Sequence, residues 1–209
     1  MRVSAPEHEP FRQRSVQGII FLVLCAVLLA FAAKQASARS SPEEFASDCG
    51  SRVVDAANSG SSSGFAAALQ DCTSIAAIAR FSLGPFAADL PPDLESDLVA
   101  AVSRFVTRSF ESNARRLQGG GFEVTGIVER PGYVEVAGRI VGSGAPVRWR
   151  LAEAGGGFRV IDVNVEGVWL SLQLRDIVTA RLRQNNGDFE AVIASLETGR
   201  PMPQDAGAG

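Results

Sequence analysis

The sequence predicts an α+β domain in which an antiparallel sheet of four to five strands is flanked by helices. Two observations predict this class. Apolar residues recur at steps of three and four in several stretches before residue 118 and again after Gly167, which is typical of helices. Between Phe122 and Val165 they alternate with polar residues, which is typical of strands. Helices are therefore expected on both sides of the sheet along the chain.

The helical stretches begin and end at residues that favour helix termini. Ser41 and Pro42 start the first helix with a capping hydroxyl and a proline suited to the first turn. The glycine run at residues 119–121 ends the longest helix. The segment 58–64, NSGSSSG, is predicted to be a flexible loop. Helices are expected over residues 41–58, 65–84 (as one or two pieces), 93–118, 168–184 and 188–196.

Four strands form the predicted sheet, and glycine-rich turns separate them. The strands are expected over residues 122–128, 134–140, 147–151 and 158–165. The turns are Pro131-Gly132, Gly142-Ser143-Gly144 and Gly155-Gly156-Gly157. In the last strand apolar residues occupy both parities, so that strand is expected to be covered on both faces.

The first 38 residues are predicted to be a signal peptide. A polar start that carries Arg12 and Arg14 precedes an uncharged apolar run at residues 18–33, and Ala36-Ser37-Ala38 supplies small residues for a peptidase. The alternative is an uncleaved membrane anchor, but the run is shorter than the roughly 20 residues that a span needs. Cys25 lies inside the run, so lipoprotein processing is not expected. The protein is expected to work outside the cytoplasm.

After the leader, residues 39–198 are expected to form a single domain and residues 199–209 a flexible C-terminal tail. This mature chain has 16 arginines, 21 acidic residues, and no lysine or histidine. An acidic chain without basic runs argues against nucleic acid as a partner. The lack of histidine removes Ser-His-Asp and Cys-His catalysis and the commonest metal ligand. We therefore expect no enzyme activity, metal or cofactor.

Two cysteines, Cys49 and Cys72, remain after the leader. A disulfide between them is expected in an oxidising compartment and would stabilise the fold by roughly 3 kcal/mol. The alternative is a pair of buried free thiols, and the sequence does not show whether the two sulfur atoms meet.

Several charged and aromatic residues allow two interpretations. Arg139, Arg148 and Arg150 lie on the polar parity of their strands, where they could pair with Glu135 or meet a lipid phosphate or a partner's acidic surface. Trp149 and Trp169 could fill the core or line a pocket.

Three segments carry a resemblance to a known family. They are I-A-R-F-S-L-G at residues 78–84, F-E-V-T-G at 122–126 and I-D-V-N-V-E-G-V-W-L at 161–170. Together they resemble the MlaC family, also called the toluene-tolerance auxiliary family. The most specific part is D-V-x-V-E-G-V-x-L in the third segment, with Arg175 shortly after it. The resemblance covers nearly the whole mature chain.

The chain departs from the family pattern at two places. Family members usually carry a small serine where this chain has Trp169, which bears on the size or mouth of the pocket. The pair Cys49 and Cys72 is outside the pattern and suggests a subfamily feature.

The resemblance implies a periplasmic protein that holds phospholipid acyl chains in an apolar cavity between a curved sheet and helices. It also implies transfer of the lipid between an inner-membrane ABC transporter complex and an outer-membrane lipoprotein complex. Some relatives are associated with hopanoid pathways, so the resemblance leaves a hopanoid or other isoprenoid lipid as an alternative cargo.

Sheet parity motivates a list of candidate residues for the cavity wall, although the sequence does not show which face of the sheet lines the cavity. These residues are Phe81, Phe105, Val124, Val134, Val136, Ile140, Trp149, Leu151, Val168, Trp169 and Leu170.

Two rival hypotheses stay open. One is an enzyme that uses carboxylates alone on a small apolar substrate, with Asp162 and Glu166 as the reacting groups. Against it, Asp162 could simply pair with an arginine and Glu166 could brace a turn. The other is a structural adaptor with a solid core and no bound small molecule.

Overall fold

The computed structural model describes residues 40–199. The described residues belong to one compact unit. The predicted signal peptide lies outside the described residues, as does the predicted tail apart from Gly199, and both stay predictions.

The helices follow the predicted periodicity closely. They are α2 (Pro42–Ser59), α3 (Ser62–Cys72), α4 (Ile75–Ser82), α5 (Glu95–Asn113), α6 (Leu170–Gln184) and α7 (Phe189–Thr198), with short 3-10 turns η1 (Gly84–Ala88), η2 (Pro92–Leu94) and η3 (Ala114–Leu117). The expected loop at residues 58–64 is wrong at both ends, because α2 extends to Ser59 and α3 begins at Ser62. The hydroxyl of Ser61 accepts a hydrogen bond from the backbone N–H of Gly64 at 3.0 Å, and this cap starts α3 inside the serine run.

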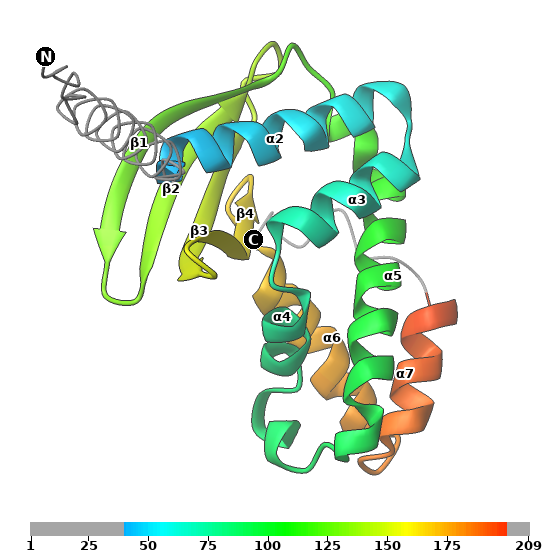
Figure 1. Ribbon diagram of the computed structural model, residues 1–209. Helices are drawn as coiled ribbons and strands as arrows, with labels where there is room; N and C mark the ends of the chain where they lie inside the picture. Colours follow the sequence, from blue (N-terminus) through cyan, green and yellow to red (C-terminus); the bar gives the residue numbers. More distant parts are fainter. Residues whose placement is uncertain (1–39, 200–209) are drawn as a thin grey trace, which may run out of the picture. The chain divides into compact units, whose positions relative to one another are not determined.

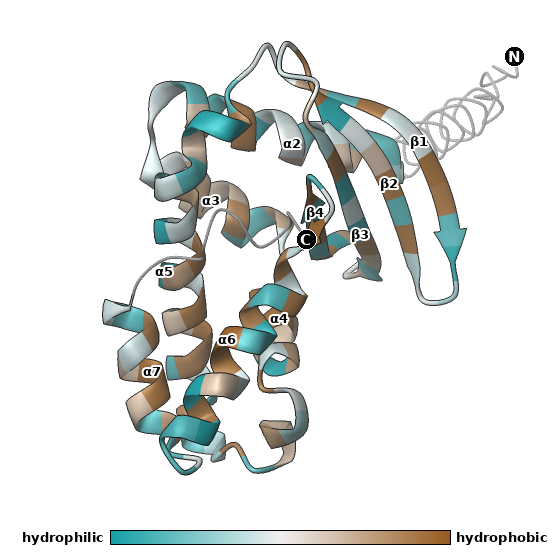
Figure 2. Cartoon of the chain, turned by 180° about the vertical axis from the view of Figure 1, so that it is seen from behind, coloured by the Kyte–Doolittle hydropathy of each residue, from teal (hydrophilic) through white to brown (hydrophobic). Residues whose placement is uncertain are grey.

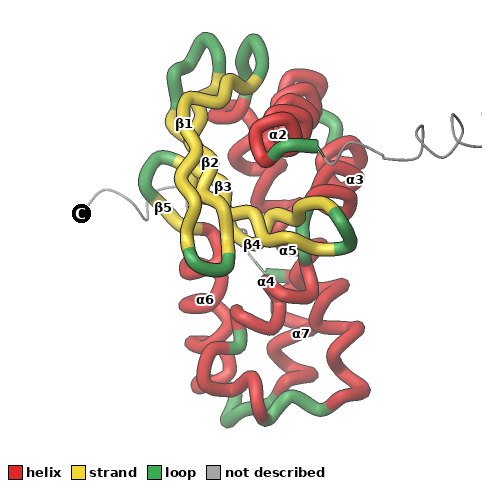
Figure 3. The backbone as a smooth tube through the Cα atoms, turned by 60° about the vertical axis from the view of Figure 1, so that its left-hand side comes forward, coloured by secondary structure: helices red, strands yellow, loops and turns green. Residues whose placement is uncertain are grey.

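The sheet is an antiparallel meander in the order β1-β2-β3-β4-β5. Its strands are β1 (Phe122–Arg130), β2 (Tyr133–Ile140), β3 (Pro146–Ala154), β4 (Gly157–Val165) and β5 (Val168–Trp169). Figure 3 shows that the sheet is strongly twisted, with β4 running in a different direction from β1 and β2. Apolar and polar residues alternate along β1 and β2, as Figure 2 shows by colour. The α+β class with an antiparallel sheet of four to five strands is confirmed, and the fifth strand is formed by residues 168–169, which were predicted to begin the following helix.

The described domain has two halves (Figure 1). In the helical half, α4, α6 and α7 pack with α5 around a core of twelve buried residues. In the sheet half, α2 lies across one face of β1 and β2, which we call the inner face, and α3 packs beside α2 and α5. The core of the sheet half includes Val136, Trp149, Leu151 and Val160.

Phe122, at the start of β1, fixes the approach of α2 to the sheet. A Cβ atom at Gly50 in α2 would lie 2.5 Å from the Phe122 ring, and one at Gly138 in β2 would lie 2.3 Å from it. Glycine at both positions therefore lets the ring lie against α2 and β2. The ring also contacts Trp149 edge-on, with centroids 5.7 Å apart.

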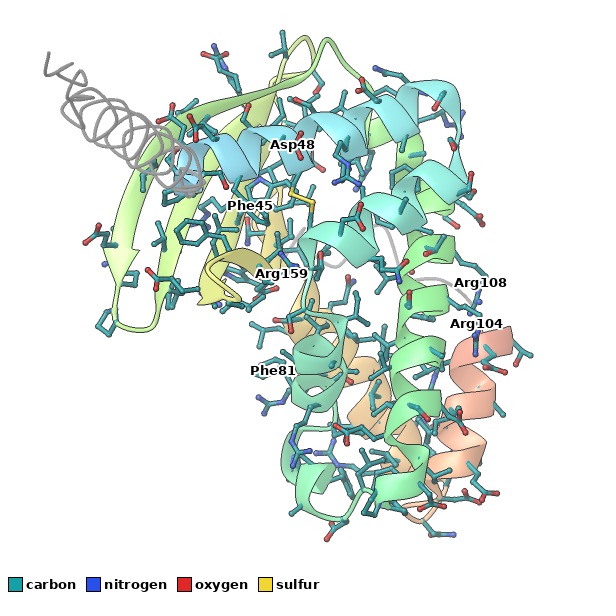
Figure 4. The ribbon with its side chains drawn as sticks, viewed as in Figure 1. Phe45, Asp48, Phe81, Arg104, Arg108 and Arg159 are labelled. Atoms are coloured by element: carbon teal, nitrogen blue, oxygen red, sulfur yellow. A yellow bond between two sulfur atoms is a disulfide. The ribbon has the colours of Figure 1, made fainter. Side chains whose placement is uncertain are left out.

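The predicted disulfide is present. It joins Cys49 of α2 to Cys72 of α3, which are 6.1 Å apart at their Cα atoms (Figure 4). The bridge therefore fixes the two helices that lie over the inner face.

Candidate functional site

A pocket of about 410 Å³ lies between the inner face of the sheet and helices α2, α3, α4, α5 and α6. This volume is within the range of roughly 300–1,000 Å³ that is usual for ligand pockets. Its apolar lining residues are Cys49, Gly50, Val53, Val54, Phe65, Ala68, Leu69, Cys72, Ile75, Ile78, Val106, Phe110, Leu117, Phe122, Ile140, Val147, Trp149, Val163, Val165, Val168, Leu170 and Leu174. Its polar lining residues are Thr73, Ser109, Asn113, Arg116, Asp162, Glu166, Ser171 and Gln173.

The walls formed by α2 and α3 present small side chains to the pocket. In α2 these are Cys49, Gly50 and Val53, and in α3 they are Ala68 and Cys72, which lie beside the larger Phe65 and Leu69. Residues four positions apart lie on the same face of a helix, so Cys49 and Val53 share one face, as do Ala68 and Cys72. Small side chains on helices that the disulfide holds in place do not fill the space below them.

Asp162 is the buried charged residue of the pocket wall. Its Oδ1 accepts hydrogen bonds from the backbone N–H groups of Val163 at 2.9 Å and Ser171 at 3.1 Å, and its Oδ2 accepts one from the Ser171 hydroxyl at 2.6 Å. Arg150 donates to Oδ2 from Nη1 at 3.4 Å. Ser171 lies in the first turn of α6, so the carboxylate from β4 caps this helix. Asp162 thus joins the sheet to α6, and both of its oxygens are engaged by structural partners.

The outer face of the sheet carries a stack of arginine and aromatic side chains. The guanidinium carbon of Arg150 lies 3.6 Å from the centroid of the Trp169 ring and 5.4 Å from that of Tyr133. Arg148 lies 5.5 Å from the Trp169 centroid and pairs with Glu135 at 3.5 Å. Trp169 is therefore engaged with the outer-face arginines and does not line the pocket.

The structure places four of the eleven predicted wall residues at the pocket. These are Ile140, Trp149, Val168 and Leu170. Trp149 buries its indole N–H, which has no hydrogen-bond partner among the described residues. The role of these residues in binding stays a prediction.

The other predicted wall residues lie away from the pocket. Val136 and Leu151 are fully buried in the core of the sheet half, and Val124 and Val134 pack against that core. Phe105 lies in the core of the helical half. Each of the five therefore contributes to packing in the structure.

Phe81 lies on the surface of α4 and is 43% exposed (Figure 4). It borders a separate, open hollow between α4, η1 and α6, and Arg175 lies 5.6 Å from its ring centroid. The structure does not bring Phe81 to the pocket between the sheet and the helices.

Sequence reasoning missed the contribution of α2, α3 and one face of α5. Val53, Phe65, Ala68 and Val106 line the pocket but were not among the candidates. The signal that points to the first three is the run of small and apolar residues at helical spacing between residues 46 and 72.

A charged pair lies at the edge of the pocket. Nη1 of Arg116, in η3, is 3.6 Å from Oε2 of Glu166, in the turn between β4 and β5. Among the described residues that line the pocket, these two are the exposed ones. They therefore mark where the pocket meets solvent.

The described residues contain no group of three or more histidine, cysteine or acidic side chains placed to hold a metal. Within residues 40–199, no helix is both long enough and apolar enough to cross a membrane.

The fold and the pocket define the class of the protein: an α+β domain whose open antiparallel sheet and helices surround an apolar ligand pocket. The family model for the MlaC protein matches residues 56–198, and the chain therefore belongs to the MlaC family. Among curated proteins, none matches the sequence.

A solved structure has the same fold. It is that of a phospholipid-binding protein from Ralstonia solanacearum, in complex with a phospholipid. The two chains are 12% identical with a TM-score of 0.64, and the match covers 76% of this chain and 96% of the other. At this identity the likeness shows the fold.

Proposed function

We propose that this protein binds the acyl chains of a phospholipid in the pocket and carries the lipid through the periplasm, between an inner-membrane ABC transporter complex and an outer-membrane lipoprotein complex. The observation that carries the proposal is the apolar pocket of about 410 Å³ in a member of the MlaC family. The phospholipid in the Ralstonia solanacearum protein of the same fold supports this choice of ligand. The predicted signal peptide supports the location.

The chemistry of the pocket suits chain binding. Burial of a methylene group stabilises binding by about 0.8 kcal/mol, so a long acyl chain supplies ample affinity without any directed polar contact. Release then becomes the difficult step. A partner that binds the emptied form more tightly than the loaded one would drive release, because a ligand shifts a conformational equilibrium only by its differential affinity. This requirement fits a carrier that takes up lipid at one membrane complex and releases it at the other.

The arrangement of Asp162 favours binding over catalysis. A reacting carboxylate needs an oxygen that can reach substrate, but the oxygens of Asp162 are held by Ser171, Val163 and Arg150. If the enzyme hypothesis is correct instead, Asp162→Asn would abolish turnover of a bound substrate while leaving its binding intact.

Native mass spectrometry of the purified mature chain, followed by extraction and identification of the lipid, tests the binding. We expect one phospholipid for each chain. Val53→Trp places a large ring in the pocket wall and should abolish lipid retention, whereas Asp55→Trp, on the exposed side of the same helix, should retain it. A mass without lipid from gently prepared wild-type protein would contradict the proposal. Identification of a neutral isoprenoid lipid would replace phospholipid as the proposed cargo.

Transfer of labelled phospholipid from donor to acceptor vesicles tests the carrier role. We expect loaded protein to deliver lipid efficiently only when the acceptor vesicles contain one of the two membrane complexes. Equal delivery to bare vesicles would mean that the partners are not needed.

A further inference from the structure

Arg116 and Glu166 differ from the rest of the pocket lining in exposure and charge. Their side chains are 49% and 48% exposed, whereas the other described lining residues are buried or half-buried. Arg116 is the one cation among these lining residues. Any anionic group of a ligand whose apolar part fills the pocket would meet Arg116 where the pocket opens.

The pair joins opposite walls of the pocket. Arg116 belongs to η3, which continues α5 on the helical side, and Glu166 belongs to the turn that ends β4 on the sheet side. Their charged atoms are 3.6 Å apart. An ion pair this exposed is screened by water and contributes little stability, so a competing anion can displace one partner at low cost.

The backbone at Glu166 is unusual for a glutamate. Its φ of +50° and the +94° of Gly167 place both central residues of the β4–β5 turn in the left-handed region. Tight turns of this kind favour asparagine and glycine, because other side chains are disfavoured at positive φ. Turn chemistry therefore does not account for a glutamate here. Disfavoured backbone of this kind is often kept at ligand sites.

From this geometry we infer that Arg116 is an anion-binding residue at the pocket mouth: it binds the phosphate of a lipid whose acyl chains fill the pocket, and Glu166 occupies its guanidinium when no phosphate is there. The inference rests on the proposed function and names the residue that binds the phosphate of the lipid. A guanidinium binds phosphate through two parallel hydrogen bonds and is well matched to it. The pocket would thus select diacyl lipids with a phosphate over neutral lipids of similar apolar size.

The other charged group of the lining does not compete for this role. Asp162 is buried and paired with Arg150 and Ser171 on another wall. When phosphate binds Arg116, the Glu166 side chain can turn into solvent, because it is already half exposed.

Binding of two matched short-chain lipids to delipidated mature protein tests the inference. Dioctanoylphosphatidylglycerol and dioctanoylglycerol share their acyl chains and differ in the phosphate headgroup. Arg116→Gln should weaken binding of the phospholipid about tenfold and leave binding of the neutral lipid unchanged, because only the phosphate contact is lost. Arg115→Gln removes the adjacent exposed arginine, which does not line the pocket, and should change neither affinity. Glu166→Gln should strengthen phospholipid binding a few-fold, since it removes the competing carboxylate.

The outcomes separate the inference from the proposed function. Equal weakening of both lipids by Arg116→Gln would give Arg116 a packing role, and no change with either lipid would remove it from the site; each result overturns the inference but leaves lipid binding intact. Failure of wild-type protein to bind either lipid would contradict the proposed function itself. Inorganic phosphate should not displace the phospholipid at millimolar concentration; displacement would show a site for free phosphate instead of a headgroup.

Discussion

The helical half and the sheet half of the domain use similar apolar residues, but one is filled and the other is hollow. In the helical half, large side chains such as Phe105, Leu98 and Leu182 are fully buried around α5. In the sheet half, the helices over the inner face present alanine, glycine, cysteine and valine, together with Phe65 and Leu69 of α3, to a pocket of about 410 Å³. Protein interiors otherwise pack as densely as organic crystals. The comparison shows that a cavity needs small side chains and also elements that cannot move together to close it.

A matched pair of phenylalanine truncations should give the largest difference between the two halves. Phe105 is fully buried in the helical half, whereas Phe65 is stacked on Phe110 and borders the pocket. We expect Phe105→Ala to lower the free energy of unfolding by about 4 kcal/mol and Phe65→Ala by about 2 kcal/mol, because Phe65 already lacks contacts on one side. Urea unfolding of lipid-free protein measures both. Equal losses would mean that the pocket is filled in solution.

Removal of the disulfide should weaken the sheet half and spare the helical half. The bridge closes a loop with a sequence separation of 23. On chain-entropy grounds, Cys49→Ser with Cys72→Ser should lower the free energy of unfolding by about 3 kcal/mol. Hydrogen exchange should show the loss of protection in α2 and α3. As a control, a reducing agent applied to the double variant should have no effect on its hydrogen exchange. Loss of protection mainly in α7 would contradict the expectation that the disulfide stabilises the sheet half.

Substitution of Asp162 should loosen the link between the two halves. Asp162→Ala leaves the first turn of α6 without its cap and Arg150 without its carboxylate. We expect a loss of about 2 kcal/mol in the free energy of unfolding, below the value for a fully buried ion pair because Arg150 is partly exposed. Asp162→Asn keeps one acceptor oxygen and should lose less in the same urea titration. An equal loss in both variants would show that the charge alone matters.

Replacement of Glu166 should have the smallest effect, and its sign should be opposite. Asparagine tolerates positive φ better than glutamate, so Glu166→Asn should raise the free energy of unfolding by up to about 1 kcal/mol. A thermal melt of the variant beside wild type measures the change. A destabilised variant would show that the ion pair with Arg116 contributes more than the strained turn costs.

Secondary structure was largely predictable because its signals are local. The change from a period of three to four residues to a period of two located the sheet between α5 and α6. The start of α3 was missed because a serine run also suits a loop, and only the hydrogen bond from the Gly64 N–H to Ser61 distinguishes the two. The strand β5 has two residues, too few to show a period.

The candidate site was less predictable because it depends on what covers each face. Val136, Ile140 and Trp149 share one face of the sheet, yet Val136 is packed in the core while the other two reach the pocket. Successive residues of α5 are rotated by about 100° around the helix axis. That step separates Phe105 in the helical core from Val106 at the pocket. Parity and period do not contain this information, since it arises from the packing of α2, α3 and α5.

The position of Phe122 between Gly50 and Gly138 has a consequence for cargo choice. The aromatic ring of Phe122 acts as a spacer that sets the distance between α2 and the strands. Phe122→Leu would let the helix settle closer to the sheet, and we expect the ratio of single-chain to double-chain lipid extracted from the protein to rise. An unchanged ratio would show that the disulfide, and not Phe122, sets the distance between α2 and the strands. Substitution of Phe122 would thus change the number of bound acyl chains without altering a contact to the lipid headgroup.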